Sequence, residues 1–168
     1  GKLVVDWSID AFINHSLVDF VIVVLPPNHT LHREDVITCV GGKSRSLSVY
    51  NGLKAAKILS PDKVLIHDVA RPAVSENIIT DIISSINEET GAAPGLPITD
   101  ALWKISDGAV EKTLDRDFIL RAQTPQGFPY SKILEAHEYQ SDERAFDDVE
   151  LAKKSGLKVI FKIGHKDN

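Results

Sequence analysis

Short apolar runs alternate with helical patterns along this chain, and no other feature limits its fold as strongly. The apolar runs are rich in β-branched residues and lie at 20–25, 63–66 and 157–163. Residues at helical spacing lie at 7–14, 46–59, 75–88, 130–139 and 147–155. Strands that alternate with helices form a largely parallel sheet covered on both faces. Because 168 residues suit one domain, we predict a single α/β domain with a mostly parallel sheet and helices on both faces.

One segment interrupts this alternation. Between residues 98 and 117, two runs containing apolar residues are separated by Asp107-Gly108, a dipeptide that strongly indicates a β-hairpin. A hairpin added to an α/β sheet can project as an arm, and Trp103 on such an arm would need a partner surface, such as a second subunit. The alternative is a hairpin folded back on its own domain with Trp103 in the core. The sequence leaves both arrangements open.

Composition argues against several classes of function. The chain has 19 Lys and Arg against 24 Asp and Glu, a net charge of −5, which disfavours a basic nucleic-acid-binding surface. No apolar run approaches the roughly 20 residues that span a membrane. The single Cys39 cannot form an internal disulfide and suits a reducing compartment. We therefore expect a cytoplasmic protein that binds neither nucleic acid nor membrane.

Asp68 and Arg71 follow the apolar run at 63–66. In open α/β sheets, ligands bind outside the carboxyl ends of the strands. At such a place Asp68 can hold a ligand hydroxyl or a metal ion, and Arg71 can hold a phosphate through two parallel hydrogen bonds. The alternative is a local Asp68–Arg71 ion pair that fixes a loop. The position in the chain favours the functional interpretation.

A glycine turn precedes the helical pattern at 46–59. Gly41 and Gly42 let the backbone approach a ligand closely. The helix that follows offers free N–H groups and a positive dipole end, which Arg45 and Ser48 can supplement. The turn resembles the end of a phosphate-binding P-loop, but Ile37 stands where the first glycine is required, so a P-loop is excluded.

A third candidate segment ends in the loop Gln-Thr-Pro-Gln-Gly-Phe at 123–128 and contains Arg116 and Arg121. The simpler interpretation of its Thr124-Pro125 pair is ordinary turn chemistry. Together with Arg71, the two arginines could form a local anion pocket in an otherwise acidic protein. This combination indicates a phosphorylated ligand.

Other potential metal ligands and nucleophiles have simpler explanations. His29 and His32 follow a Pro-Pro turn and are expected in a solvated loop. Cys39 has no base nearby in the sequence and is expected to be a buried thiol. Asp147 and Asp148 could bind Mg²⁺, but a helix cap explains them better, so no metal ligand is assigned.

Taken in order, these segments resemble one family, the 2-C-methyl-D-erythritol 4-phosphate cytidylyltransferases. The segments that carry the resemblance are Gly41-Gly42-x-x-Arg45-x-x-Ser48, His67-Asp68-x-Ala70-Arg71-Pro72, Arg116 and Gln123-Thr124-Pro125-Gln126. The resemblance covers nearly the whole chain. It implies a Rossmann-like nucleotidyltransferase fold with a protruding β-arm at 98–117 that interlocks a homodimer.

The resemblance also implies a reaction. CTP and 2-C-methyl-D-erythritol 4-phosphate are joined to 4-diphosphocytidyl-2-C-methyl-D-erythritol in non-mevalonate isoprenoid biosynthesis, with release of pyrophosphate. The substrate phosphate attacks the α-phosphorus of CTP, and Mg²⁺ binds mainly through the CTP phosphates. Positioning and charge stabilisation carry most of such a reaction.

The family match also implies roles for individual residues. The implied nucleotide site consists of Gly41, Gly42, Arg45, Ser48 and Asp68. Asp68 would also hold hydroxyls of the methylerythritol unit, with Arg71 beside it, and Thr124 would hydrogen-bond the same substrate. Arg116, reaching in from a partner's arm, would position the substrate phosphate and is the expected catalytic residue.

The chain departs from the family at several places. A glycine-rich loop with catalytic cations would precede Gly1, and a lysine would follow Asn168. Because the chain also lacks methionine, we expect it to be the interior of a longer protein. Ala101 replaces a frequent threonine of the arm. Phe146, before Asp147 and Asp148, replaces the threonine of a Thr-Asp-Asp motif. The segments at 100–102 and 121–128 are most similar to the branch fused to a cyclodiphosphate synthase domain.

Two alternatives stay open. A ribitol-5-phosphate cytidylyltransferase would share the fold, the nucleotide and most of the motifs. A truncated, non-catalytic nucleotide-binding or dimerising module would lack the catalytic cations.

Overall fold

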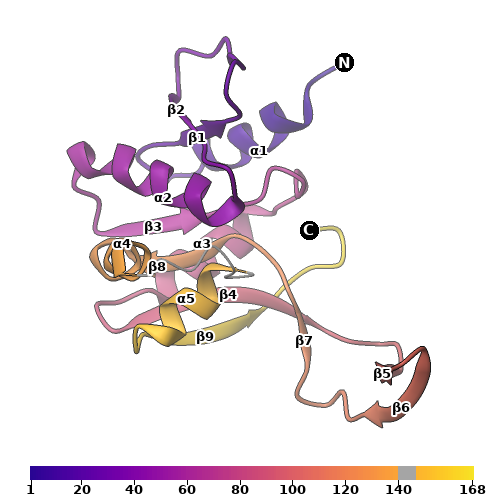
Figure 1. The fold of residues 1–168 in the computed structure, drawn as a ribbon. Helices are drawn as coiled ribbons and strands as arrows, with labels where there is room; N and C mark the ends of the chain where they lie inside the picture. Colours follow the sequence, from indigo (N-terminus) through magenta and orange to yellow (C-terminus); the bar gives the residue numbers. More distant parts are fainter. Residues whose placement is uncertain (140–146) are drawn as a thin grey trace.

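The computed structural model describes residues 1–139 and 147–168 (Figure 1). Its elements, in chain order, are α1 (Val4–Ile13), β1 (Ile22–Leu25), β2 (Ile37–Val40), α2 (Arg45–Ala56), the short 3₁₀ helix η1 (Lys57–Leu59), β3 (Lys63–Ile66), α3 (Glu76–Ser85), β4 (Thr90–Pro97), β5 (Leu102–Ser106), β6 (Ala109–Leu114), β7 (Leu120–Ala122), β8 (Gln126–Pro129), α4 (Tyr130–Tyr139), α5 (Asp148–Lys154) and β9 (Lys158–Ile163). Strands and helices alternate through most of the chain, so the predicted α/β fold is confirmed.

The larger sheet has five strands, four of them in the order β3-β8-β4-β7, and β9 also pairs with β4. β9 runs parallel to β4 over six residue pairs, from Thr90↔Lys158 to Gly95↔Ile163. β8 runs antiparallel to both β3 and β4, so β3, β4 and β9 share one direction. The prediction of a mostly parallel sheet is therefore right for these three strands and wrong for β7 and β8, which pair antiparallel. Most of β8 lies in the segment at 123–128 that was expected to be a loop.

Side-chain caps that are recognisable in the sequence fix the starts of three helices. Ser75 caps α3 by accepting a hydrogen bond from the N–H of Ile78, and Ser44 caps α2 in the same way. The Asp147 side chain caps α5 by accepting from the N–H of Glu150. Each cap satisfies one of the backbone donors that a helix start leaves without a partner.

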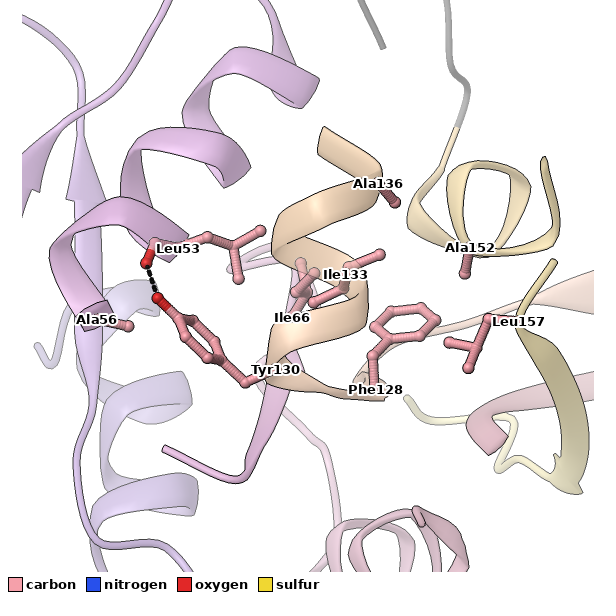
Figure 2. Packing of buried hydrophobic residues seen from close by; sticks show 9 residues of the cluster. All are labelled: Leu53, Ala56, Ile66, Phe128, Tyr130, Ile133, Ala136, Ala152 and Leu157. Carbon is pink, nitrogen blue, oxygen red and sulfur yellow. Dashed lines mark hydrogen bonds between the residues drawn. The ribbon is translucent and has the colours of Figure 1, made fainter. Parts of the chain in front are cut away.

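The core lies on both faces of the sheet. On one face α2, α4 and α5 pack against β3 and β8 around a cluster that includes Phe128 and Ile133, both fully buried. Figure 2 shows this cluster, in which the Tyr130 hydroxyl donates to the Leu53 carbonyl at 2.9 Å. On the other face α1 and α3 pack around a second cluster that includes Ile79. Helices therefore cover both faces, as predicted.

β4 is unusual because proline stands inside a central strand. β8 pairs with β4 at Ala92, and β7 pairs with it from Gly95 onward. Between these contacts, the N–H of Gln123 donates to the Pro94 carbonyl at 2.9 Å. The N and O atoms of a strand residue point to the same side, so the nitrogen of Pro94, which carries no hydrogen, also faces this break in the ladder. The break lets the segment at 123–125 leave the sheet edge.

The hairpin prediction is confirmed. β5 and β6 pair antiparallel from Leu102↔Leu114 to Ser106↔Ala109, and Asp107 and Gly108 both have positive φ, as a tight hairpin turn requires. The pair projects away from the rest of the chain (Figure 1). Trp103 is 62% exposed, so the alternative that placed it in the core of its own domain is wrong.

A hollow of about 790 Å³ separates the small parallel β1–β2 sheet from β3. Apolar side chains of α1, α2, β1 and β3 form most of its wall. Arg45, Ser48, His67 and Asp68 also line it. Within the described ranges, no helix is long and apolar enough to cross a membrane.

Candidate active site

Two candidate residues and a neighbouring histidine meet where β3 ends. The N–H of Asp68 donates to the Thr124 hydroxyl at 3.1 Å, and the same hydroxyl lies 3.0 Å from Nδ1 of His67. Thr124 is buried, with 3% of its surface exposed. Asp68 and Thr124, which the resemblance assigns to the same substrate, are thus neighbours, and His67 connects to both through the threonine hydroxyl.

His67 is held in a mostly apolar setting. Its Nε2 lies 3.0 Å from the Arg71 carbonyl, and its ring packs against Phe12 at 4.8 Å between centroids. Burial lowers the pKa of His67 below its ordinary value. The imidazole is therefore neutral at pH 7, and it connects α1 to the loop after β3.

Arg71 does not pair with Asp68. Its guanidinium donates to the Asn168 carbonyl at 2.9 Å and to the Ala122 carbonyl at 3.3 Å, so it ties three distant chain segments together. The alternative of a local Asp68–Arg71 ion pair is wrong. Asn168 in turn donates its side-chain amide to the Thr124 carbonyl at 2.9 Å, which fixes the backbone of the threonine loop.

Asp68 pairs instead with Arg45, the first residue of α2. Nε of Arg45 lies 3.2 Å from Asp68 Oδ1, and Nη1 lies 2.7 Å from Asp148 Oδ2. Burial alone would lower the pKa of Arg45, but the two carboxylates outweigh it and raise that pKa. Arg45 is thus a fixed cation between α2, α5 and the end of β3.

Asp148 is almost completely buried, with 1% of its surface exposed. Its other oxygen, Oδ1, lies 3.1 Å from Nε2 of His137. Burial alone would raise the pKa of Asp148, but His137 and Arg45 together outweigh it and hold that pKa below its usual value. The interpretation of both neighbouring aspartates as caps is therefore right for Asp147 and wrong for Asp148, whose carboxylate bridges Arg45 and His137.

The glycine turn is locked by its own helix. The N–H of Gly42 donates to Ser48 Oγ at 3.1 Å, and that hydroxyl donates to the Ser44 carbonyl at 2.9 Å. A Cβ on Gly41 would lie 2.8 Å from Ser48 Oγ, and one on Gly42 would lie 2.4 Å from the Cβ of Leu47. Both glycines are thus required because the turn packs tightly against the start of α2. This intramolecular reason differs from the ligand approach that we predicted.

Arg116 stands apart from this cluster. It lies in the segment between β6 and β7 at the base of the arm, where its guanidinium donates to the Thr99 carbonyl. Across residues 1–139 and 147–168, the recorded hydrogen bonds and ion pairs do not join it to Asp68, Arg71 or Thr124. Arg121 lies in β7 and is exposed. Arg71 and Arg116 both donate to main-chain carbonyls, and the anion pocket of Arg71, Arg116 and Arg121 stays a prediction.

The part of the chain that the structure describes contains no group of three or more His, Cys, Asp or Glu side chains able to hold a metal ion. The Asp68 side chain is 42% exposed and is the carboxylate of the cluster that a ligand can reach. His29 and His32 are both exposed, as predicted. Cys39 is only partly buried, and burial raises the pKa of its thiol.

The sequence did not indicate His137, and it did not indicate that Asp148 contacts Arg45. His137 and Asp148 come from helices α4 and α5, and Asp148 is 103 residues from Arg45 along the chain. No local motif joins them. Phe146, noted as a departure from the family, lies outside the described residues.

A glycine turn at a helix start, an arginine–carboxylate pair and a threonine loop lie together at the end of β3, the part of an open α/β sheet where ligands bind. Comparison of the chain with known protein families identifies the class more closely. The family described as IspD, 2-C-methyl-D-erythritol 4-phosphate cytidylyltransferase, matches residues 1–168. The chain belongs to this family.

Relatives of two kinds match the chain equally well. It is 42% identical to a bifunctional enzyme IspD/IspF of a Ruegeria species, a match that covers 100% of the chain and 45% of that relative. It is also 42% identical to a 2-C-methyl-D-erythritol 4-phosphate cytidylyltransferase of Roseobacter denitrificans, covering 96% of the chain and 74% of that protein. The chain thus spans less than half the length of the bifunctional relative.

The fold is also that of solved members of the family. The crystal structure of 2-C-methyl-D-erythritol 4-phosphate cytidylyltransferase from Thermus thermophilus superposes with a TM-score of 0.88 at 31% identity. The match covers 99% of this chain and 81% of that one. The arrangement of α2, β3 and the threonine loop therefore belongs to a known nucleotidyltransferase fold.

Proposed function

We propose that the protein transfers the cytidylyl group of CTP to 2-C-methyl-D-erythritol 4-phosphate, giving 4-diphosphocytidyl-2-C-methyl-D-erythritol and pyrophosphate. One observation carries this proposal: Arg45, Asp68 and Thr124 meet at one strand end in a chain that matches the family over its full length. The exposed side of the Asp68 carboxylate can accept hydrogen bonds from polyol or ribose hydroxyls. The Thr124 loop and the locked glycine turn flank it, so substrate and nucleotide are placed side by side.

Mg²⁺ is part of this proposal and suits the residues in a limited way. Asp148 is already engaged by Arg45 and His137, which leaves Asp68 as the carboxylate that could supply an oxygen ligand. A site with so few protein ligands fits an ion carried mainly by phosphate oxygens. The ion would neutralise charge on the triphosphate, while Asp68 orients hydroxyls and Arg45 holds Asp68 in place.

We further propose a homodimer formed through the arm at 98–117. The arm exposes Trp103 and Ile105 by 62% and 69%, and apolar side chains gathered on a projecting hairpin favour contact with another protein. Arg116 lies at the base of this arm and away from Asp68 and Thr124, so a partner's arm is the route by which a guanidinium would reach the substrate phosphate. The free thiol of Cys39 suits the proposed cytoplasmic setting.

The test is Mg²⁺-dependent release of pyrophosphate from CTP, measured with the purified protein and either 2-C-methyl-D-erythritol 4-phosphate or ribitol 5-phosphate. Release with the first substrate alone is expected. Release with ribitol 5-phosphate alone would assign the protein to that sister activity. Binding of CTP without any release would favour the non-catalytic nucleotide-binding module, and Arg116→Ala should reduce turnover without changing CTP affinity.

A further inference from the structure

Three helices meet at a single buried carboxylate. Asp148 is the first residue of α5, Arg45 is the first residue of α2, and His137 lies in the last turn of α4. The two oxygens of Asp148 are used separately, Oδ2 by Arg45 at 2.7 Å and Oδ1 by His137 at 3.1 Å. Tyr50 of α2 stacks parallel to the His137 ring at 6.3 Å between centroids.

The two sides of Arg45 differ in strength and exposure. The bond to Asp148 is short and reaches a side chain that is 1% exposed, whereas the bond to Asp68 is 3.2 Å long and reaches one that is 42% exposed. A charge-assisted hydrogen bond is strongest where water is excluded. A ligand that engages Asp68 can therefore replace the weaker bond while the Asp148 bond keeps Arg45 in place.

We propose that the His137–Asp148 pair is a positioning device that fixes Arg45, and through it the glycine turn at 41–44, in the orientation that receives the nucleotide. The nature of that ligand rests on the proposed function. His137 orients the carboxylate, since an N–H on Nε2 donates to Oδ1 and leaves Oδ2 aimed at Arg45. Arg45 begins the helix whose first turn also carries Ser48, the residue that holds the N–H of Gly42.

The same contacts would also be present if the pair only stabilised the packing of α2, α4 and α5. The test therefore needs a measurement at the glycine turn at 41–44. The first readout is amide hydrogen exchange of Gly42 and Ser48 relative to amides of the β4–β9 ladder in the ligand-free protein. The second is the dissociation constant for CTP with Mg²⁺, measured by calorimetry. The first readout requires no bound ligand.

The variants are Asp148→Asn, Arg45→Gln, their double variant, and the pair His137→Leu and His137→Gln. Asp147→Asn is the matched control, because it removes a neighbouring charge at the same helix start while asparagine still caps the helix. His137→Gln keeps an N–H donor, so it should retain more function than His137→Leu. Partners in one hydrogen-bond network couple strongly, and we expect Asp148→Asn to weaken CTP binding about tenfold.

The proposal predicts that Asp148→Asn speeds exchange at Gly42 and Ser48 more than in the β4–β9 ladder, and that the double variant binds CTP no more weakly than the weaker single variant. Unchanged relative exchange at the turn would overturn it. Faster exchange at the turn together with a CTP affinity equal to that of the parent would also overturn the proposal, because the pair would then only stabilise helix packing. If the parent protein does not bind CTP, the proposed function fails, and exchange at the turn still decides whether the pair positions it.

Discussion

Removing the hydroxyl of Tyr130 isolates the contribution of one buried hydrogen bond to stability. In the structure this hydroxyl donates to the Leu53 carbonyl at 2.9 Å (Figure 2). Lys57, four residues beyond Leu53, donates its N–H to Lys54 instead, so the tyrosine hydroxyl supplies a partner in the last turn of α2. Burial raises the pKa of Tyr130, with a further contribution from Glu138, so the hydroxyl is protonated and able to donate at neutral pH.

The expected magnitude follows from these contacts. An intramolecular hydrogen bond contributes about 1 kcal/mol net, and a buried carbonyl left without a partner costs up to about 3 kcal/mol. Tyr130→Phe should therefore lower the free energy of unfolding by about 1–2 kcal/mol. For a domain of this size, that corresponds to a Tm roughly 2–8 °C lower.

Thermal unfolding followed by circular dichroism, with urea unfolding as a second measure, checks this value. Tyr139→Phe is the control, because Tyr139 lies on the same helix and is 83% exposed, and it should change stability by less than about 0.5 kcal/mol. A Tyr130→Phe protein that melts within a degree of its parent would show that the hydroxyl adds nothing to the packing of α4 against α2.

Two further outcomes follow from the site and the arm. Because burial lowers the pKa of His67, the unfolded chain takes up a proton that the folded chain does not as the pH falls through about 6.5. The free energy of unfolding should therefore fall between pH 7 and pH 5, and it should fall less in His67→Gln. The control His29→Gln changes an exposed loop position and should follow the parent. Identical pH profiles for His67→Gln and the parent would contradict the argument. If the arm holds a homodimer, the Trp103→Ser variant should sediment as a monomer at concentrations where the parent is dimeric. Asp107→Asn, at the hairpin turn, is the control and should stay dimeric. A Trp103→Ser variant that is still dimeric would show that Trp103 is not needed at the interface.

The helices and the hairpin were predictable because their signals are local. α3 shows a stripe of isoleucines behind a serine cap, and the structure buries Ile78, Ile79 and Ile82 as that pattern requires. The Asp107-Gly108 turn adopts the positive φ angles that its composition favours. Such features depend on residues within one or two turns of each other, so the sequence contains all that is needed to find them.

The central strands were not predictable in this way. β4 reads Thr-Gly-Ala-Ala-Pro-Gly-Leu-Pro, in which Thr90 is the only one of the β-branched residues that mark a strand. Packing explains the composition: a Cβ on Gly91 would lie 2.7 Å from the Phe128 ring, and one on Gly127 of β8 would lie 2.6 Å from Ile82. Large side chains from the helices fill the space that small strand residues leave, and that complementarity is visible only once the fold is known.

The residues of the candidate site also differ in whether local sequence signals could identify them. Asp68 could be placed at a ligand-binding edge because it follows a strand, and Thr124 was linked to the same substrate only by the resemblance to the family. The contacts that hold Arg45 could not be predicted, because His137 and Asp148 reach it through the packing of three helices and no sequence pattern connects these residues.

The position of β4 has a consequence for the order in which the chain folds. Its partner β9 lies more than 60 residues further along, at Lys158–Ile163, and the cluster around Phe128 includes Leu157. Pairings this distant in sequence form slowly, because a long loop must close before any contact compensates its lost entropy. During synthesis, β4 would therefore wait with one edge unpaired until nearly the whole sequence shown here has left the ribosome. We expect completion of the β4–β9 ladder to be the slow step of folding.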